Sequence, residues 1–372
     1  MKVSVSQQQL AHGLGIVSRA VSSHSTLPVL ANILVATDEG RLRLSATNLE
    51  LGISCWIGAQ IEQEGAVTVP ARTFSDLVGT LPSDGVNLTL DERTQTLNVV
   101  CGTSNTDIKG IDAQEFPPMP VPNLDVGIEL NVADFKEMIH QVAFAASADD
   151  ARPVLQGVSM TVEGSEISLA ATDGFRISVR RAKLSSPVPQ PMTAIIPARA
   201  LNELARVASD GKATLHMVIP DGRGQVLFHL DDVELVSQLI DGNFPDYRAI
   251  MPQSFKTTTV VSTAEFLKAC KQAEIIAREG NNVVRLSISA ETGAVEISAQ
   301  SEETGSSEVV VGATVEGSDL VVAFNVKYLR ELLDVVKSAS VALETNANNT
   351  PGMMRPVGDE DFKHVIMPMH LG

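Results

Sequence analysis

The chain has 372 residues, 44% of them hydrophobic and 20% charged, which is typical of a folded globular protein with room for two or three domains. A formal charge of -17 excludes a protein that binds nucleic acid through a generally basic surface, so any such contact must be local. No stretch approaches the roughly 20 apolar residues of a membrane span, and the opening MKVSVSQQQL lacks the apolar core of a signal peptide. We therefore expect a cytoplasmic protein that does not enter a membrane.

The cysteines and histidines indicate neither a disulfide nor a metal site. Cys55, Cys101 and Cys270 are odd in number, far apart and outside any CxxC pair. Cysteine in a reducing compartment behaves as a small buried hydrophobic residue, so we expect buried thiols. The seven histidines show no metal-ligand spacing, and no phosphate-binding glycine loop, HExxH or EF-hand loop is present in the sequence. The sequence thus predicts no metal and no cofactor.

The first third of the chain shows a regular series of elements. Alternating apolar residues in MKVSV predict a strand, and helical spacing predicts a helix directly after it. The stretch ILVATDEGRLRLSA alternates on both sides of a turn at 38–40, which indicates an antiparallel hairpin. A second helix follows Pro70, with apolar residues at three- and four-residue steps from Phe74 to Leu81. The proline-rich segment 117–122 then predicts a stiff extended linker.

This series returns twice. Its landmarks are an opening helix, a hairpin, a second helix and a closing segment with proline, and they begin at Asn131, Arg152, Ile196 and Asn243 in the second unit and at Ser262, Asn281, Phe324 and His364 in the third. Pro197 follows Pro70 after 127 residues, and Asn325 follows Pro197 after 128. Landmarks that recur in the same order at a constant interval indicate an internal repeat.

The repeat predicts the fold class. We expect three domains, 1–125, 126–253 and 254–372, each with two helices packed on antiparallel sheets in an α+β arrangement. The predicted helices carry basic residues opposite their apolar faces, namely Arg19, Arg72, Lys136, Arg199, Arg206, Lys268, Lys271, Arg278, Lys327, Arg330 and Lys337. Acidic residues are interleaved with them, so the pattern by itself is typical of a solvated helix face.

Two short motifs allow both a structural and a functional interpretation. Asp173 in TDGFR, 172–176, is a possible general base, but the corresponding TNLE and QSEE have different chemistry, which favours a turn role. The terminal VIMPMHL, 365–371, fits a last strand of the third unit and equally an adaptable apolar pocket for partner peptides. Periodicity does not choose between these two interpretations of the tail.

Taken together, the three repeats and the motifs TLPVLANIL, ATDGFRIS, DGNFPDYRAIMP, FNVKYL and VIMPMHL resemble the bacterial DNA polymerase III beta sliding clamp family over residues 1–371. The resemblance implies a non-catalytic processivity subunit without cofactor. In this family two chains join head to tail into a closed ring of six similar domains, with helices lining the hole. Weak, sequence-independent contact suits sliding on duplex DNA, and helix cations in an acidic protein can supply it.

The resemblance also implies partners and site residues. The partners are duplex DNA, a second copy of the chain, the DNA polymerase III alpha subunit, the clamp loader, and other polymerases and repair proteins that carry clamp-binding motifs. Carried over by position, the peptide-binding residues are Leu155, Thr172, Gly174, Phe175, Arg176, Ile177, Pro245, Ile250, Pro351, Val365, Ile366, Met367, Pro368, Met369 and Leu371. The DNA-binding residues are His24, Arg72, Arg152, Arg199, Lys268, Lys271 and Lys327, and the dimer interface pairs Thr106 and Ile108 with Ile275 and Ile276.

Two positions depart from the pattern that the resemblance implies. Ala249 stands where relatives often carry arginine, which removes a polar anchor for a bound peptide. Thr106 stands where the resemblance implies a large aromatic residue in some relatives, and its smaller apolar surface predicts a looser dimer.

Two other functions stay open at this point. An enzyme with a site at a domain junction would use Asp173 and Arg176, and it predicts a pair of titrating groups in a polar cleft. An open repeat scaffold predicts polar capping at both ends instead of two complementary apolar edges.

Overall fold

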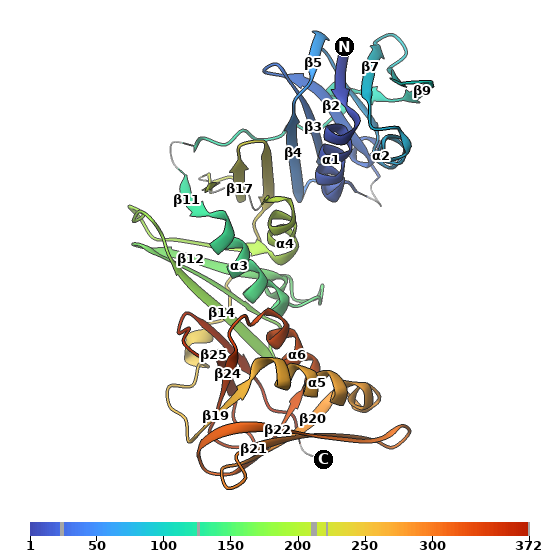
Figure 1. Ribbon diagram of the computed structural model, residues 1–372. Helices are drawn as coiled ribbons and strands as arrows, with labels where there is room; N and C mark the ends of the chain where they lie inside the picture. Colours follow the sequence, from blue (N-terminus) through green and yellow to red (C-terminus); the bar gives the residue numbers. More distant parts are fainter. Residues whose placement is uncertain (23–25, 125–126, 210–213, 221, 371–372) are drawn as a thin grey trace. The chain divides into compact units, whose positions relative to one another are not determined.

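A computed structural model describes residues 1–22, 26–124, 127–209, 214–220 and 222–370 (Figure 1). The chain folds into two compact units, the first built from Met1–Ala133 and Glu203–Leu239 and the second from Asp134–Asn202 and Ile240–Gly372. The boundaries between these units fall within helices α3 (Val132–Val142) and α4 (Ala198–Val207). None of the helices in the described part of the chain is long and apolar enough to span a membrane.

The first unit is built on antiparallel sheets. One sheet has the order β5 (Gln60–Gln63), β1 (Lys2–Ser6), β7 (Gly85–Asp91), β8 (Thr96–Cys101) and β9 (Ser104–Lys109). The other has the order β10 (Ile111–Asp112), β6 (Ala66–Pro70), β2 (Asn32–Asp38), β3 (Arg41–Thr47), β4 (Leu51–Ile57), β18 (Val233–Gln238), β17 (Gln225–Leu230), β16 (Thr214–Val218) and β11 (Ile128–Asn131). The β4–β18 pair therefore joins strands that are far apart in the sequence.

Helices α1 (Gln7–Val17) and α2 (Ala71–Thr80) pack against each other in the first unit. The Ser6 hydroxyl accepts a backbone N–H in the first turn of α1, which satisfies one donor that the helix itself leaves unpaired. In α2, the side chains of Phe74 and Val78 are 0% exposed, and each burial contributes about 2 kcal/mol. The periodic apolar residues of this region thus form the predicted buried helix face.

The second unit contains one large antiparallel sheet whose strands differ in length. Its order is β15 (Met192–Pro197), β12 (Gly157–Glu163), β13 (Glu166–Thr172), β14 (Arg176–Lys183), β26 (Phe362–Ile366), β25 (Gly352–Pro356), β24 (Ser340–Thr345), β19 (Thr257–Ser262), β22 (Gly305–Gly317), β21 (Ala294–Ser301), β20 (Val283–Ser289) and β23 (Leu320–Asn325). Strand β22 pairs with β21 along 305–312 and with β19 along 313–317, so it connects the two halves of the sheet.

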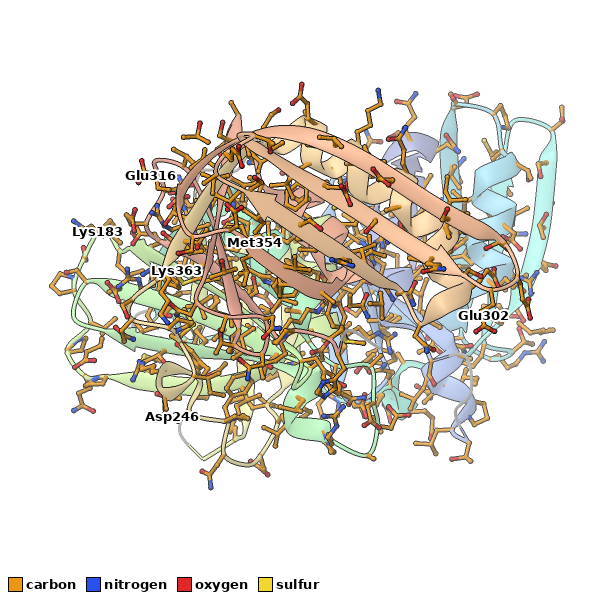
Figure 2. All side chains as sticks on the ribbon, turned by 90° about the horizontal axis from the view of Figure 1, so that it is seen from below. Lys183, Asp246, Glu302, Glu316, Met354 and Lys363 are labelled. Atoms are coloured by element: carbon orange, nitrogen blue, oxygen red, sulfur yellow. The ribbon has the colours of Figure 1, made fainter. Side chains whose placement is uncertain are left out.

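Helices α5 (Thr263–Ala277) and α6 (Val326–Val335) lie side by side over the strands of the second unit (Figure 1). Ser262 caps α5 and Asn325 caps α6, each by accepting a backbone N–H from the first helical turn. Phe266 of α5 and Leu332 of α6 are buried in one core with residues of the sheet, among them Met354, which is labelled in Figure 2.

Most elements predicted from the sequence are present. The hairpins β2–β3, β12–β13 and β20–β21 are confirmed, and the three cysteines are free and buried. Burial raises the pKa of the Cys55 and Cys270 thiols to about 12. The predicted linker 117–122 lies outside helices and strands, but Met119 packs against a small buried cluster that includes Phe116. The tail forms strand β26, which confirms the structural interpretation of VIMPMHL for residues up to Ile366.

Candidate functional site

The candidate site is built on strands β14, β26 and β25 of the second unit. Val365 of β26 lies opposite Ile177 of β14 and Met353 of β25, and these three side chains belong to one buried apolar cluster. Phe244 and Tyr247 from the NFPDYRAIMP segment pack against this cluster. The strands therefore form a floor, and the proline-containing segment forms a wall beside it.

Large apolar side chains stay exposed in the segments of chain that adjoin the floor and the wall. Phe175 is 58% exposed, Ile250 is 46% exposed and Met367 is 40% exposed. The Met367 N–H donates to the Phe175 carbonyl at 2.9 Å, so these two residues are neighbours at the end of the β14–β26 pair. Exposed apolar residues that gather in one place mark binding surfaces more often than isolated ones do. We name Phe175, Ile250 and Met367, with their floor, the docking surface.

The wall of the docking surface is fixed by a short turn. Asp246, labelled in Figure 2, accepts the N–H of Arg248 at 3.2 Å through its carboxylate. The turn holds Tyr247 with its ring edge-on to Phe244, at 6.5 Å between ring centroids. Edge-on aromatic pairs of this kind stabilise beyond the area that they bury.

The TDGFR turn holds Phe175 in its exposed position. Thr172 accepts the Gly174 N–H at 3.0 Å and donates to the Arg176 carbonyl at 2.6 Å. Asp173 Oδ1 accepts the N–H groups of Phe175 at 2.9 Å and Arg176 at 3.1 Å. Gly174 has φ of +95°, a conformation that residues with a side chain rarely adopt. The turn role predicted for Asp173 is confirmed.

The side chain of Arg176 points into the protein and is 6% exposed. Its guanidinium pairs with Asp173 at 3.1 Å and with Glu331 at 2.5 Å, and it donates to the Phe144 carbonyl at 2.9 Å. It also lies 4.3 Å from the ring centroid of Tyr328. Burial, followed by the nearby Asp173 charge, raises the pKa of Tyr328. Arg176 thus shapes the turn beneath the docking surface rather than its exposed face.

His364 lies on β26 opposite Ser178 of β14. The repeat marked it only as the start of a closing segment and did not predict a buried histidine there. His364 is 0% exposed and stacks on Phe144 with 5.5 Å between ring centroids. Within the described residues, neither ring nitrogen has a hydrogen-bond partner. Burial, and secondly the charge of Arg176, lowers the pKa of His364 to about 3. The imidazole is therefore neutral at physiological pH.

The other peptide-binding candidates divide by burial. Thr172, Ile177, Val365 and Ile366 are buried in the strands. Ile177 and Val365 belong to the floor, whereas Ile366 packs in the core that α5 and α6 cover. Pro245 is exposed, whereas Leu155, Pro351, Pro368 and Met369 are half-buried. The Met369 N–H donates to the Ala323 carbonyl at 2.8 Å, which ties the tail to β23. Leu371 lies outside the described residues.

Most of the candidate DNA-binding cations contact carboxylates. Lys271 pairs with Asp334 at 3.0 Å, Lys327 with Glu331 at 3.8 Å, Arg72 with Asp76 at 3.7 Å, and Arg152 with Asp149 at 2.9 Å. Arg199 and Lys268 are exposed on α4 and α5. His24 lies outside the described residues. Exposed ion pairs are worth little, so these cations can exchange a carboxylate for a phosphate at small cost.

The candidate interface residues lie on an edge strand and on a helix. Thr106 is half-buried and Ile108 is 4% exposed on β9, the last strand of its sheet. Ile275 is 59% exposed on α5, and Ile276 packs partly against the core of the second unit. An edge strand offers unpaired backbone groups to another chain. Thr106 and Ile275 are therefore the more accessible members of the predicted pairs.

The fold and the docking surface define a repeated α+β protein that offers an apolar surface for binding. Models of the N-terminal, central and C-terminal domains of the DNA polymerase III beta subunit match residues 1–120, 129–246 and 248–370. The chain belongs to this family, the beta sliding clamps.

Similar proteins cover the full length of the chain. The beta sliding clamp of Synechococcus elongatus is 32% identical over 100% of both chains, and that of Bacillus subtilis is 33% identical over 99% of both. The crystal structure of the Bacillus subtilis clamp matches with a TM-score of 0.95 at 32% identity over 100% of both chains. A Pseudomonas aeruginosa sliding clamp bound to griselimycin matches with a TM-score of 0.93 at 26% identity over 100% of both chains.

These comparisons confirm the resemblance and the three-domain α+β fold. The protein is a DNA sliding clamp that tethers polymerases, and it is a non-catalytic processivity factor of DNA polymerase III. The enzyme alternative is therefore wrong, and Asp173 and Arg176 are bonded to each other and to their own turn.

Proposed function

We propose that the docking surface binds short peptide segments of the clamp's partners. The observation that carries this proposal is the exposure of Phe175, Ile250 and Met367 in the segments that adjoin one buried apolar floor. A peptide with spaced leucine and phenylalanine side chains would cover these residues and remove their apolar area from water. The Pseudomonas aeruginosa clamp was solved with bound griselimycin, which supports a ligand-binding surface in this family.

The partners that we propose are the DNA polymerase III alpha subunit, the clamp loader, and other polymerases and repair proteins with clamp-binding motifs. We propose the cytoplasm as the location of the protein.

We place the domains at 1–125, 126–253 and 254–372. The limit at 125 falls between the first two family matches, whereas the limit at 253 falls inside the third match.

Peptide binding can be tested with a fluorescent peptide that contains glutamine followed by spaced leucine and phenylalanine. We expect micromolar binding to the full chain and none to a chain that lacks Met367–Gly372, because this deletion removes Met367 from the docking surface. A matched control is Val310→Ser on β22, which changes an apolar side chain that is 63% exposed and outside the cluster. The proposal fails if the full chain and the truncated chain bind the peptide equally, or if neither binds it.

We propose further that two copies close into a ring around duplex DNA through Thr106 and Ile108 of one copy and Ile275 and Ile276 of the other. The exposure of Ile275 and the edge position of β9 support this arrangement over an open scaffold. Contact with DNA would come from the cations of the helices and would depend strongly on salt, as non-specific phosphate contacts do.

The proposed ring predicts that one charged side chain placed in the interface separates the dimer into monomers. Ile275→Glu should yield monomers in analytical ultracentrifugation, because a carboxylate would be buried without a partner. Thr106→Phe should lower the dissociation constant, since it adds apolar area to the interface. A wild-type protein still dimeric at low nanomolar concentration would contradict the looser dimer that Thr106 implies. An Ile275→Glu protein that stays dimeric would contradict the interface itself.

A further inference from the structure

The turn of the docking surface has a counterpart in the first unit. Thr47 accepts the Leu49 N–H at 3.0 Å and donates to the Leu51 carbonyl at 3.1 Å. Asn48 Oδ1 accepts the Leu51 N–H at 2.8 Å. The turn 172–176 is held by the same bonds, made by a threonine and the acceptor residue that follows it. The same turn therefore occurs in both units, at 47–51 and at 172–176.

The strands after the two turns are also paired alike. The Gln238 N–H at the end of β18 donates to the Glu50 carbonyl at 2.8 Å, just as the Met367 N–H at the end of β26 donates to the Phe175 carbonyl at 2.9 Å. We name the β4–β18 pair with its turn the first junction, and the β14–β26 pair with its turn the second junction. The linker 117–120 stands beside the first junction, where the NFPDYRAIMP segment stands beside the second.

The first junction lines a cavity of about 130 Å³ that is open on one side. Its lining includes Gly52 and Val236 from the strands, Leu49 and Glu50 from the turn, and the linker residue Met119. A Cβ atom on Gly52 would lie 2.5 Å from Met119 Cε and 2.9 Å from Val236 Cγ1. A side chain at position 52 would therefore displace the Met119 side chain from the cavity wall.

Leu49 at the rim of this cavity has an unusual conformation. Its φ is +75°, and its side chain is 51% exposed. The corresponding residue of the second junction is Gly174, for which such a φ is unstrained. A leucine in the left-handed region is strained, and burial of only half of its side chain offsets little of that strain. Strain of this kind is retained where it serves a contact.

We propose that the cavity at the first junction is a second peptide-docking site of the clamp. It takes one aliphatic side chain, with a lysine or arginine beside it that pairs with the exposed Glu50. A cavity of about 150 Å³ admits benzene, so the volume present here suits a leucine side chain. The proposal rests on the peptide-binding role of the docking surface, because the first junction is compared with that surface.

The test uses the full-length protein and the peptide acetyl-Lys-Leu-Lys-amide with a photoreactive diazirine in the leucine. After illumination, mass spectrometry locates the labelled residues. We expect label on 47–52 and on 117–120, and we expect Leu49→Gly to lower that label about tenfold, because it removes the apolar rim. Glu50→Lys should lower it by repelling the lysines. Leu49→Gly should keep or raise the melting temperature, since glycine relieves the strained φ.

The outcomes for the two sites are separable. Phe175→Ser should leave the label on 47–52 unchanged while weakening binding of the glutamine–leucine–phenylalanine peptide. Label confined to 172–177 and to the tail would overturn the second site and leave the proposed function standing. Label on 47–52 that does not change in Leu49→Gly or Glu50→Lys would also overturn it. Failure of the glutamine–leucine–phenylalanine peptide to bind the docking surface would overturn the proposed function, whatever the label shows at the first junction.

Discussion

At the first junction the residues that follow the turn are Leu51 and Ile53, which are 4% and 0% exposed. At the second junction the corresponding residues are Arg176 and Ser178, which are 6% and 0% exposed. The backbone bonds of the two turns agree, as do the strand pairings that follow them. The same backbone thus buries apolar side chains at one junction and polar side chains at the other.

The difference continues in the partner strands. His364 of β26 lies opposite Ser178, whereas Leu235 of β18 lies opposite Ile53. Buried polar groups cost stability unless they are paired, and proteins break packing rules mainly where a function requires it. Backbone N–H groups, a threonine and the acceptor side chain that follows it preserve the turn, so the buried side chains are free to diverge. The polar junction is the one that carries the docking surface.

Replacing the buried cation should have the largest effect. Arg176→Met keeps the apolar stem but removes the cation that pairs with Asp173 and leaves Glu331 with only Lys327, at 3.8 Å. We expect a loss of about 3 kcal/mol. Hydrogen exchange of the β14 and β26 amides measures this local stability. Arg176→Met combined with Glu331→Gln should recover part of the loss, because one unpaired charge is removed. Unchanged protection in Arg176→Met would show that the ion pairs do not hold the second junction.

His364 makes the second junction sensitive to acid. Its pKa in the folded protein is lowered to about 3, below the ordinary value of 6.5, so the unfolded chain binds a proton more readily. The stability due to neutral His364 is complete above pH 6.5 and is lost as the pH falls toward 3. Between pH 6.5 and 5 the loss is about 2 kcal/mol.

The variant His364→Phe should remove this part of the acid sensitivity, because phenylalanine can keep the stack on Phe144. Urea denaturation at pH 7 and pH 5 measures the effect. The exposed His140 of α3 provides the control, and His140→Gln should retain the wild-type dependence on pH. Equal acid sensitivity in wild type and His364→Phe would contradict a buried neutral histidine.

The two junctions should differ in the peptide that they bind. Phe175→Ser removes a large apolar contact, so we expect the glutamine–leucine–phenylalanine peptide to bind about tenfold more weakly, by fluorescence anisotropy. Leu49→Gly should leave that affinity unchanged, since Leu49 belongs to the first junction. A comparable loss in both variants would mean that the junctions do not act as separate sites.

The smallest effect is expected for single cations on DNA. Lys268→Ala should reduce the slope of log K against log salt by about 0.9 if Lys268 contacts one phosphate. Lys183 and Lys363, labelled in Figure 2, lie on strands β14 and β26 and provide matched controls. Equal slopes for Lys268→Ala and Lys183→Ala would contradict DNA contact through the helices.

Sequence periodicity predicted the helices and hairpins because their stabilising contacts are local or regular. Phe74 and Val78 lie one turn apart and are both buried. The turns of the β12–β13 and β20–β21 hairpins contain Gly164 and Gly293, which both have positive φ. The recurrence of these features at a constant interval was sufficient to predict three domains.

The buried chemistry of the second junction could not be predicted in this way. Arg176 and Glu331 are 155 positions apart in the sequence, so no local sequence pattern predicts their contact. The sequences TNLE and TDGFR look dissimilar, yet they form the same turn, because the donors are backbone N–H groups and only the acceptor side chains matter. The wall residue Tyr247 belongs to a recognised landmark, but its packing on the floor depends on tertiary structure.

Methionine-methyl NMR of the full-length protein, titrated with the glutamine–leucine–phenylalanine peptide, is the sharpest test of peptide docking at the second junction. Met367 and Met251 lie at the docking surface and its wall, and Met119 lies at the first junction. We predict that the signals of Met367 and Met251 shift in proportion to bound peptide while that of Met119 stays in place. Shifts at Met119 alone, or no shift at Met367 when the peptide is bound, would contradict peptide docking at the second junction.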